Sequence, residues 1–476
     1  MEKEPSIFEA LLPLVVLVAL LAGNVALFDD PLGGANQSAL FLSAAVAAVA
    51  VWFRRRSFGA IMAQVVETIG SAVPPIIILL LVGSLSGTWM IGGIVPALIY
   101  YGLDLINPAW FLVTSVLVCA IVSLVTGSSW STVATVGVAL MGIGEALNIS
   151  EGMTAGAIIS GAYFGDKVSP LSDTTNLASA MANVNLFTHV RYMMFTTVPS
   201  FLLTCGLFLF IGYSNYGASY KATDIEEVKT AIDAVFHISP WLFLAPVGLF
   251  IIILLKTPPV PALLAGTILG ALFALLFQFD VVHIAAGPDV SGNVSVAYAG
   301  VMQAFFGAVT IPSDNVKVCE LLSTGGMSGM LSTVWLILSA MIFGGVMESG
   351  GLLLRLTRPM LLWAKNTGSL VATAVVTCIF FNFTASDQYL SIVVTGRMFR
   401  KAFSDKKLMP EVLSRTLEDS GTMTSVLVPW NTCGAAQSKV LGVATITYLP
   451  YCFFNLISPI MSILFAYLNI KIRRKG

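Results

Sequence analysis

One polar, proline-containing segment lies inside a chain that is otherwise almost entirely apolar. Residues 161–178 read Gly-Ala-Tyr-Phe-Gly-Asp-Lys-Val-Ser-Pro-Leu-Ser-Asp-Thr-Thr-Asn-Leu-Ala, with long apolar stretches before and after them. In a lipid bilayer an ionised side chain and an interrupted helix are both costly, so both occur where they line a protein cavity or an ion path. The segment therefore predicts a binding site embedded in a membrane.

The composition supports a polytopic, all-α membrane protein. Hydrophobic residues make up 57% of the chain and charged residues only 10%, against about 25% charged residues in a typical soluble domain. The mean hydropathy is +0.89. The formal net charge is −1, and no basic stripe is present that could neutralise nucleic-acid phosphates, which excludes nucleic-acid binding as a main role.

The two halves of the chain resemble each other at a shift of 258 residues. Gly92-Gly93 aligns with Gly350-Gly351, and Thr126-Gly-Ser-Ser129 aligns with Thr384-Ala-Ser-Asp387. In the same register Asp173 aligns with Asn431, although the nearby prolines are one residue out of step. Such internal repeats are common in secondary transporters.

The distribution of basic residues indicates that the repeats have opposite orientations. Residues 57–166 contain no Lys or Arg, whereas the shifted window 315–424 contains ten. Because basic loops stay in the cytoplasm, the loops of the first window are expected outside and those of the second inside. The clusters Arg54–Arg56 and 471–475 are both expected to be cytoplasmic, which places both termini on the cytoplasmic side of the cell membrane.

The resulting architecture has two inverted-topology repeats, with about ten full spans, two hairpins and broken transmembrane helices. The stretches 109–147 and 367–397 must each leave and return on one side, either as re-entrant hairpins or as pairs of short spans. Glycines at 152, 156, 161 and 165 are spaced for close helix packing. The predicted regions are 1–56 (N-terminal spans), 57–190 (first repeat), 191–314 (connecting spans and loop), 315–445 (second repeat) and 446–476 (last span and tail).

Each repeat contributes a polar hairpin turn and a polar, proline-broken span. The candidate binding residues of the first repeat are Thr126, Ser128, Ser129, Ser172, Thr174 and Asn176. Those of the second repeat are Thr384, Ser386, Asn431 and Thr432, and its broken span also carries Glu418 and Asp419. The candidate acids for coupling ions to protons are Asp166, Asp173 and Asp387.

These residue types suit a hard cation such as sodium, which prefers several oxygen ligands. Desolvation disfavours the charged form of a carboxyl group, so a buried carboxylate can exchange a bound cation for a proton. In the 258-residue register Ser129 is replaced by Asp387 and Asp173 by Asn431, which leaves one acid in each of two equivalent sites. These four residues are the predicted sodium ligands.

Structural roles compete with these interpretations. Asp173 and Asp387 both precede possible half-helices, where Asp is a favoured N-cap. Asp166 and Lys167 are adjacent and could form an ion pair, and Trp130 could pack instead of lining the site. Lys167, Trp130 and Asp419 are therefore secondary candidates.

Other functional classes find little support in the sequence. The chain contains no His-Glu-x-x-His or Gly-x-Ser-x-Gly motif, which argues against an enzyme. The three histidines and six cysteines lack metal-ligand spacing, so no cofactor is expected beyond the transported ions.

The motif Gly165-Asp-Lys-Val-Ser-Pro-Leu-Ser-Asp-Thr-Thr-Asn-Leu-Ala178, preceded by Thr126-Gly-Ser-Ser-Trp130, resembles the signature of the NhaC family of sodium/proton antiporters. The resemblance covers most of the chain. It implies membership of the ion transporter superfamily, whose divalent-anion:sodium symporters pair Ser-Asn-Thr hairpin motifs in inverted repeats. It also implies a homodimer that works by an elevator motion. Ser172-Asp-Thr174 and Trp430-Asn-Thr432 match those motifs only loosely.

The favoured function is a secondary transporter that exchanges sodium, with lithium as a second cation, for protons. The alternative is sodium-coupled transport or exchange of a small carboxylate or amino acid, since some relatives of the family handle organic solutes. Lys167, Trp130 and Asn431 would be natural contacts for such a carboxylate.

Overall fold

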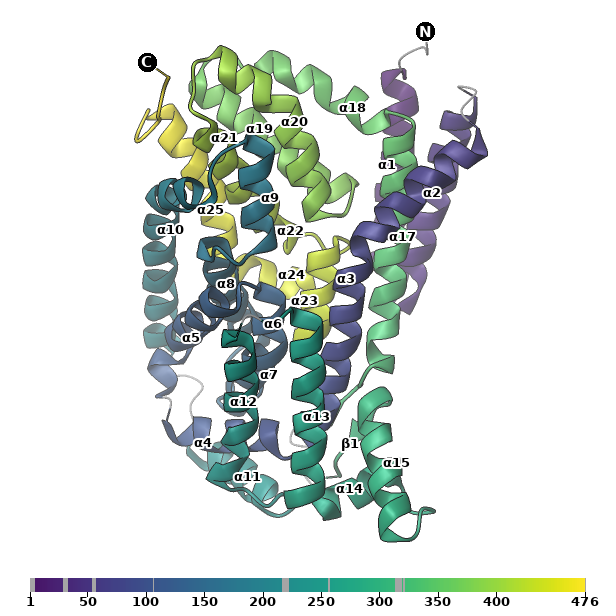
Figure 1. Cartoon of the computed structure of the whole chain (residues 1–476), viewed down its shortest axis with the longest axis vertical. Coiled ribbons are helices and arrows are strands. Elements are labelled where there is room, and N and C mark those ends of the chain that lie inside the picture. Colours follow the sequence, from purple (N-terminus) through teal and green to yellow (C-terminus); the bar gives the residue numbers. More distant parts are fainter. Residues whose placement is uncertain are drawn as a thin grey trace.

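A computed structural model shows a helical bundle elongated along one axis (Figure 1). The structure describes residues 5–28, 33–53, 57–105, 107–215, 222–255, 257–312, 319 and 322–475. The basic cluster 54–56, on which part of the predicted orientation depends, lies outside these residues. In the described part, strands are limited to the antiparallel pair β1 (Val309–Thr310) and β2 (Ser323–Thr324).

The expected all-α polytopic fold is confirmed. By length and composition, the described part contains eight helices that can cross a membrane, or nine if the bent pair Thr445–Tyr451 and Phe453–Tyr467 is one span. Two of the eight, Pro108–Thr126 and Thr367–Thr384, are the first arms of the predicted hairpins. The polar broken spans are absent from this set. The helix Glu151–Val168 is 18 residues long but contains three charged residues, and the second broken span consists of shorter helices.

Long apolar helices form one side of the bundle. Helix α3 is 34 residues long, or roughly 50 Å at 1.5 Å per residue, and it packs against α17, α13 and α15. Helix α2 packs against both α1 and α17. The bounds are α1 (Ile7–Leu27), α2 (Ala35–Trp52), α3 (Phe58–Ile91), α12 (Leu244–Leu254), α13 (Pro259–Phe277), α14 (Phe279–Ala286), α15 (Asn293–Phe306) and α17 (Leu331–Ser349).

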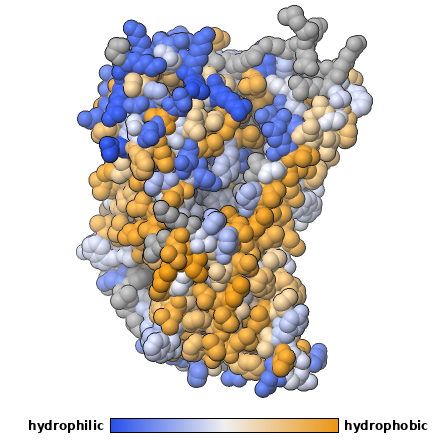
Figure 2. All heavy atoms as spheres, viewed as in Figure 1, coloured by the Kyte–Doolittle hydropathy of each residue, from blue (hydrophilic) through white to orange (hydrophobic). Residues whose placement is uncertain are grey.

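The hydrophilic residues gather at one end of the molecule. Figure 2 shows them over the end that carries α19, α20 and α21, while apolar side chains cover most of the rest of this face. The start of α1 and the end of α25 (Phe453–Tyr467) both lie at this end (Figure 1). Helices α10 (Leu186–Asn215) and α11 (Ala222–Asp233) lead to the opposite end.

The two repeats are visible as inverted copies. Helix α3 ends at a turn through Gly92-Gly93 into α4 (Ile94–Leu105), and α17 ends at Gly350-Gly351 before α18 (Leu352–Thr357). Gly93 and Gly351 both have positive φ, +71° and +64°, a conformation in which glycine avoids the steric cost of a side chain. Helices α4 and α18 lie at opposite ends of the molecule (Figure 1), so the repeats point in opposite directions.

Each repeat then forms a hairpin. In the first, α5 (Phe111–Thr126) turns at Gly127 into a return arm, which consists of α6 (Ser129–Thr132), the π-helical turn η3 (Val133–Gly137) and α7 (Val138–Ala146). In the second, α19 (Thr367–Thr384) turns at residues 385–387 into α20 (Gln388–Asp405). The arms of the second hairpin lie at the hydrophilic end of the molecule (Figure 1).

A broken span follows each hairpin. The first is α8 (Glu151–Val168) and α9 (Asp173–Ala182), separated by residues 169–172. The second begins with α21 (Pro410–Leu417), continues through the π-helical turn η7 (Glu418–Thr422) and α22 (Met423–Ser425), and resumes at α23 (Thr432–Leu441). Helix α24 (Thr445–Tyr448) then leads into α25.

Glycines bring α5 and α8 into close contact, as their spacing predicts. A Cβ atom at Gly161 would come within 2.2 Å of the Val116 carbonyl oxygen, and one at Gly165 within 2.3 Å of the Ala120 carbonyl oxygen. Such close backbone approach is typical of helix pairs in membranes. It fixes the end of α8 against the tip of the first hairpin.

We expect Gly161→Ala to lower the free energy of unfolding by about 1–3 kcal/mol, because the added methyl group forces the two backbones apart. Thermal unfolding of the purified protein in detergent measures the change. Gly206→Ala on α10 is the matched control, since no described atom outside its own helix lies within 4 Å of an added Cβ. Equal effects of the two substitutions would contradict a role for Gly161 in packing.

Candidate functional site

The break between α8 and α9 meets the tip of the first hairpin through Asp166. This carboxyl is 5% exposed and accepts two hydrogen bonds on Oδ2 from Ser129, from the backbone N at 3.1 Å and from Oγ at 2.6 Å. Its other oxygen, Oδ1, is buried and has no hydrogen-bond partner among the described residues. Ser129 therefore fixes one oxygen of Asp166, and the other oxygen lacks such a partner.

Asp173 joins the two repeats. Ser172 is the N-cap of α9, and its Oγ accepts a hydrogen bond from the Thr175 backbone N at 3.4 Å, so the proposed capping role of Asp173 is wrong. Asp173 is the first helical residue, and its Oδ1 accepts from the Thr174 backbone N at 2.8 Å. The Tyr389 hydroxyl on α20 donates to Asp173 Oδ2 at 2.5 Å.

These two acids lie on the wall of a cavity of about 430 Å³. Five predicted site residues line it, namely Asp166, Asp173, Thr126, Ser128 and Trp130. The second repeat contributes Gln388 and Tyr389 to the lining. Further lining comes from Pro74 and Ile78 on α3 and from residues 257–260, before and at the start of α13. The carboxyl groups of Asp166 and Asp173 on its wall favour cations.

The second hairpin also has a buried acid at its tip, but this acid is not among the described residues that line the 430 Å³ cavity. Asp387 is 1% exposed, and its Oδ1 caps α20 by accepting from the Leu390 backbone N at 2.9 Å. Ser386 has a positive φ of 59°. Its Oγ is buried without a hydrogen-bond partner in the described structure, and its carbonyl oxygen accepts from the Thr432 backbone N at 3.0 Å. This contact joins the tip of the hairpin to the break.

Asn431 holds the second break in place. Its Oδ1 accepts from the Cys433 backbone N at 3.0 Å, which caps α23, and its Nδ2 donates to the Asn382 carbonyl oxygen at 3.0 Å. The predicted sodium ligands are thus divided between two places. Ser129 contacts Asp166 rather than Asp173, while Asp387 and Asn431 belong to the second tip and break.

The structural register at the site differs by one residue from the sequence register. The turn residues with positive φ are Gly127 and Ser386, and the N-caps of the return arms are Ser128 and Asp387. In both pairs the second residue follows the first by 259 positions. Likewise the N-caps of the half-helices are Ser172 and Asn431. The predicted pairs Ser129 with Asp387 and Asp173 with Asn431 are therefore wrong, because one additional residue lies between Gly351 and the second tip.

The remaining predicted residues mostly support the two tips and breaks. Thr126 Oγ1 accepts from the Ser128 backbone N at 3.3 Å, and Asn176 Nδ2 donates to the Ser172 carbonyl oxygen at 2.6 Å. Thr384 Oγ1 donates within its own helix to the Phe380 carbonyl oxygen at 2.7 Å. Thr432 Oγ1 lies 3.4 Å from Asn431 Oδ1.

A buried ion pair lies behind the cavity. Lys167 pairs with Asp419 and not with its neighbour Asp166, and both partners are 0% exposed. Lys167 Nζ also donates to Ser458 Oγ at 2.8 Å, and Thr196 Oγ1 donates to Asp419 Oδ2 at 3.0 Å. Thr196 and Ser458 are missing from the predicted site because they come from α10 and α25, outside both polar motifs.

Two further residues of this region make contacts that were not predicted from the sequence. Glu418, in η7, accepts from Thr174 Oγ1 at 3.1 Å on Oε1. Tyr389 follows the hairpin acid Asp387 and bridges to Asp173. An acid inside an apolar span is itself a signal of function, but the partners of both residues depend on how the repeats pack together.

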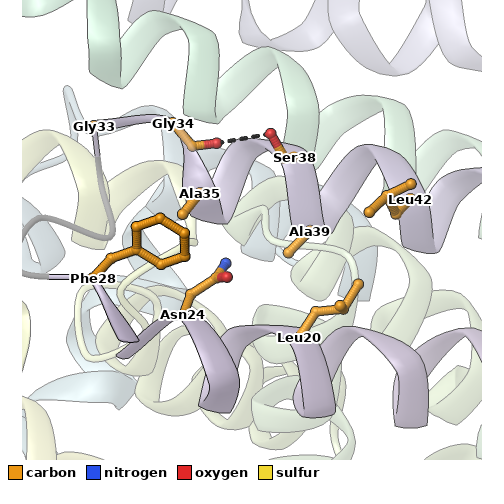
Figure 3. A pocket seen from close by; sticks show the side chains of 9 residues that line it. All are labelled: Leu20, Asn24, Phe28, Gly33, Gly34, Ala35, Ser38, Ala39 and Leu42. Atoms are coloured by element: carbon orange, nitrogen blue, oxygen red, sulfur yellow. Dashed lines mark hydrogen bonds between the residues drawn. The ribbon is translucent and has the colours of Figure 1, made fainter. Parts of the chain in front are cut away.

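Two other cavities lie away from these acids. One of about 760 Å³ is lined by parts of α3, α4, α7 and α23 and includes Glu145, Glu151 and Lys439. The other, of about 590 Å³, lies between α1 and α2, where Figure 3 shows Leu20, Phe28 and Leu42 around it. None of the predicted site residues lines either cavity in the described structure.

Comparisons with known proteins agree on one family. The sequence model described as "Na+/H+ antiporter family" matches residues 161–470, from the first broken span to the last helix. The chain is 36% identical to the Na(+)/H(+) antiporter NhaC of Alkalihalophilus pseudofirmus, over 100% of this chain and 98% of that protein.

Two relatives carry names that include organic solutes. The malate-2H(+)/Na(+)-lactate antiporter of Bacillus subtilis is 33% identical, over 97% of this chain and 95% of that protein. The arginine/ornithine antiporter ArcD of Halobacterium salinarum is 31% identical, over 100% and 94% respectively.

Proposed function

This chain belongs to the Na+/H+ antiporter family, and on that premise we propose that it is a secondary transporter that exchanges sodium for protons across the membrane. The observation that carries the proposal is the cavity lined by both Asp166 and Asp173, in which Asp166 has one carboxyl oxygen, Oδ1, without a hydrogen-bond partner among the described residues. A second NhaC antiporter, from Bacillus subtilis, is 36% identical over 90% of this chain and supports the same function.

The cavity supplies ligands that suit sodium. Hard cations prefer carboxylate, hydroxyl and carbonyl oxygens, and Asp166, Asp173, Thr126 and Ser128 bring such oxygens to one wall. The break at residues 169–172 places non-helical backbone between these two acids, as in the discontinuous helices of other transporters. In this proposal Asp166 and Asp173 hold the ion, while Asp387 fixes the second hairpin tip, whose return arm supplies Tyr389.

Transport of an organic solute is the second candidate function, because the names of two relatives include such solutes. Charge argues against an organic anion in this cavity. Lys167, the expected contact for a carboxylate, is committed to Asp419, and neither Lys167 nor Asn431 is among the described residues that line the cavity. An organic anion in this cavity would face the carboxyl groups of Asp166 and Asp173.

We expect purified protein in liposomes to move protons when a sodium gradient is applied with no organic solute present. A pH-sensitive dye inside the liposomes reports the proton flux, and sodium-22 reports the uptake of sodium. The same assay is repeated with a panel of carboxylates and amino acids. Sodium uptake that depends strictly on one of these solutes would replace simple exchange by the second candidate.

A further inference from the structure

An acidic side chain lies behind the cavity, on the π-helical turn η7 in the second broken span. Glu418 is 0% exposed, and it lines none of the three cavities described above. A π-helical turn places an additional residue in the helix and is frequent at functional sites. Because Glu418 does not line the 430 Å³ cavity, a hydrated cation in that cavity does not contact this carboxyl directly.

Thr174 connects Glu418 to the cavity. Its Oγ1 donates a hydrogen bond to Glu418 Oε1 at 3.1 Å, while its backbone N donates to Asp173 Oδ1 at 2.8 Å. One residue thus contacts both acids. The second oxygen of Glu418, Oε2, is buried without a hydrogen-bond partner among the described residues.

The charges around Glu418 do not balance if it is ionised. The titratable groups that face it are Lys167 and Asp166 on α8, the Cys378 thiol on α19 and Asp419 on its own turn. The ammonium group of Lys167 is paired with Asp419. Among the described residues Glu418 therefore forms no ion pair, and ionising a buried carboxyl that has no ion-pair partner is costly.

We propose that Glu418 carries the proton that this protein exchanges, while Asp166 and Asp173 hold the sodium ion in the cavity. This assignment rests on the proposed function. With the cavity empty of sodium, the proton is bound to Oε2 and the carboxyl is neutral. When sodium enters from one side and binds beside Asp166, the proton leaves Oε2 for the water on that same side and the carboxylate remains. One positive charge enters the buried cluster as one leaves it, so its total charge does not change.

Two transport measurements distinguish the residue that carries the proton from the residues that bind sodium. Exchange of internal sodium for external sodium-22 needs the cavity but no proton, whereas sodium-driven proton movement needs both. We expect Glu418→Gln to lose sodium-driven proton movement and to retain sodium/sodium exchange. Glu226→Gln, at an exposed position on α11, is the matched control and is expected to retain both fluxes.

The outcomes are distinct. Sodium-driven proton movement in Glu418→Gln at the wild-type rate would overturn the assignment. If the wild-type protein itself moves no protons with sodium, the proposed function fails before any variant is compared.

A second variant decides the question if Glu418→Gln loses both fluxes. Thr174→Val removes the hydroxyl that donates to Glu418 and keeps the shape of the side chain. We expect it to shift the pH profile of sodium/proton exchange, with this flux measured at each pH relative to the sodium/sodium exchange of the same variant. An unchanged pH profile in Thr174→Val would overturn the assignment.

Discussion

Replacing Asp166 by Asn is expected to abolish both sodium-driven proton movement and sodium/sodium exchange. Asn retains the size of the side chain and an oxygen that can accept the hydrogen bonds from Ser129. It removes the negative charge that a partly dehydrated cation needs as compensation. Both fluxes are measured in liposomes with sodium-22 and an internal pH dye.

A matched control separates loss of the site from loss of the fold. Asp405→Asn changes an exposed carboxylate at the end of α20 and is expected to retain both fluxes. Asp166→Asn should unfold at a temperature close to that of the wild type, because its hydrogen bonds to Ser129 remain possible. Sodium/sodium exchange at the wild-type rate in Asp166→Asn would remove this residue from the sodium site.

Removing one partner of the Lys167–Asp419 pair should give the largest loss of stability in this chain. Both side chains are 0% exposed, so Lys167→Met leaves a buried carboxylate whose remaining donors are the hydroxyls of Thr196 and Ser458. We expect the free energy of unfolding to fall by about 3–5 kcal/mol. The measurement is thermal unfolding in detergent, followed by the loss of monodisperse protein.

The double variant Lys167→Met/Asp419→Leu should recover most of this loss, because replacing a buried pair by apolar side chains is often neutral or stabilising. Lys401→Met, at an exposed position on α20, is the control for the loss of a lysine and should leave stability unchanged. If the double variant is as unstable as the single one, the pair does not account for the effect. The hydrogen bonds of the pair with the Thr196 and Ser458 hydroxyls would then be the more important interactions.

The sequence predicted the inverted repeats and the places where the chain is interrupted. Gly93 and Gly351, the two polar hairpin turns and the breaks before α9 and α23 all lie where the repeated motifs put them. These features could be predicted because each depends on local sequence, such as a glycine pair, a proline or an N-cap residue. Positively charged loops then distinguish the two orientations.

Pairing within the site could not be predicted from the same information. The one-residue difference in register moved the equivalent of Asp387 from Ser129 to Ser128. The contacts of Lys167 with Asp419 and of Tyr389 with Asp173 join residues more than two hundred positions apart. Such contacts are set by the packing of one repeat against the other, to which a local motif gives no guide.

The unequal distribution of acids between the repeats has an energetic consequence. Two identical inverted halves would exchange roles as the transporter turns from one side of the membrane to the other, so its two end states would have equal energy by symmetry. Here Asp173 has Thr432 as its structural equivalent, and Asp387 has Ser128. The symmetry is therefore broken at the charged positions, and the empty protein must have a preferred resting side. These few unmatched side chains help to determine which side of the membrane the empty transporter faces.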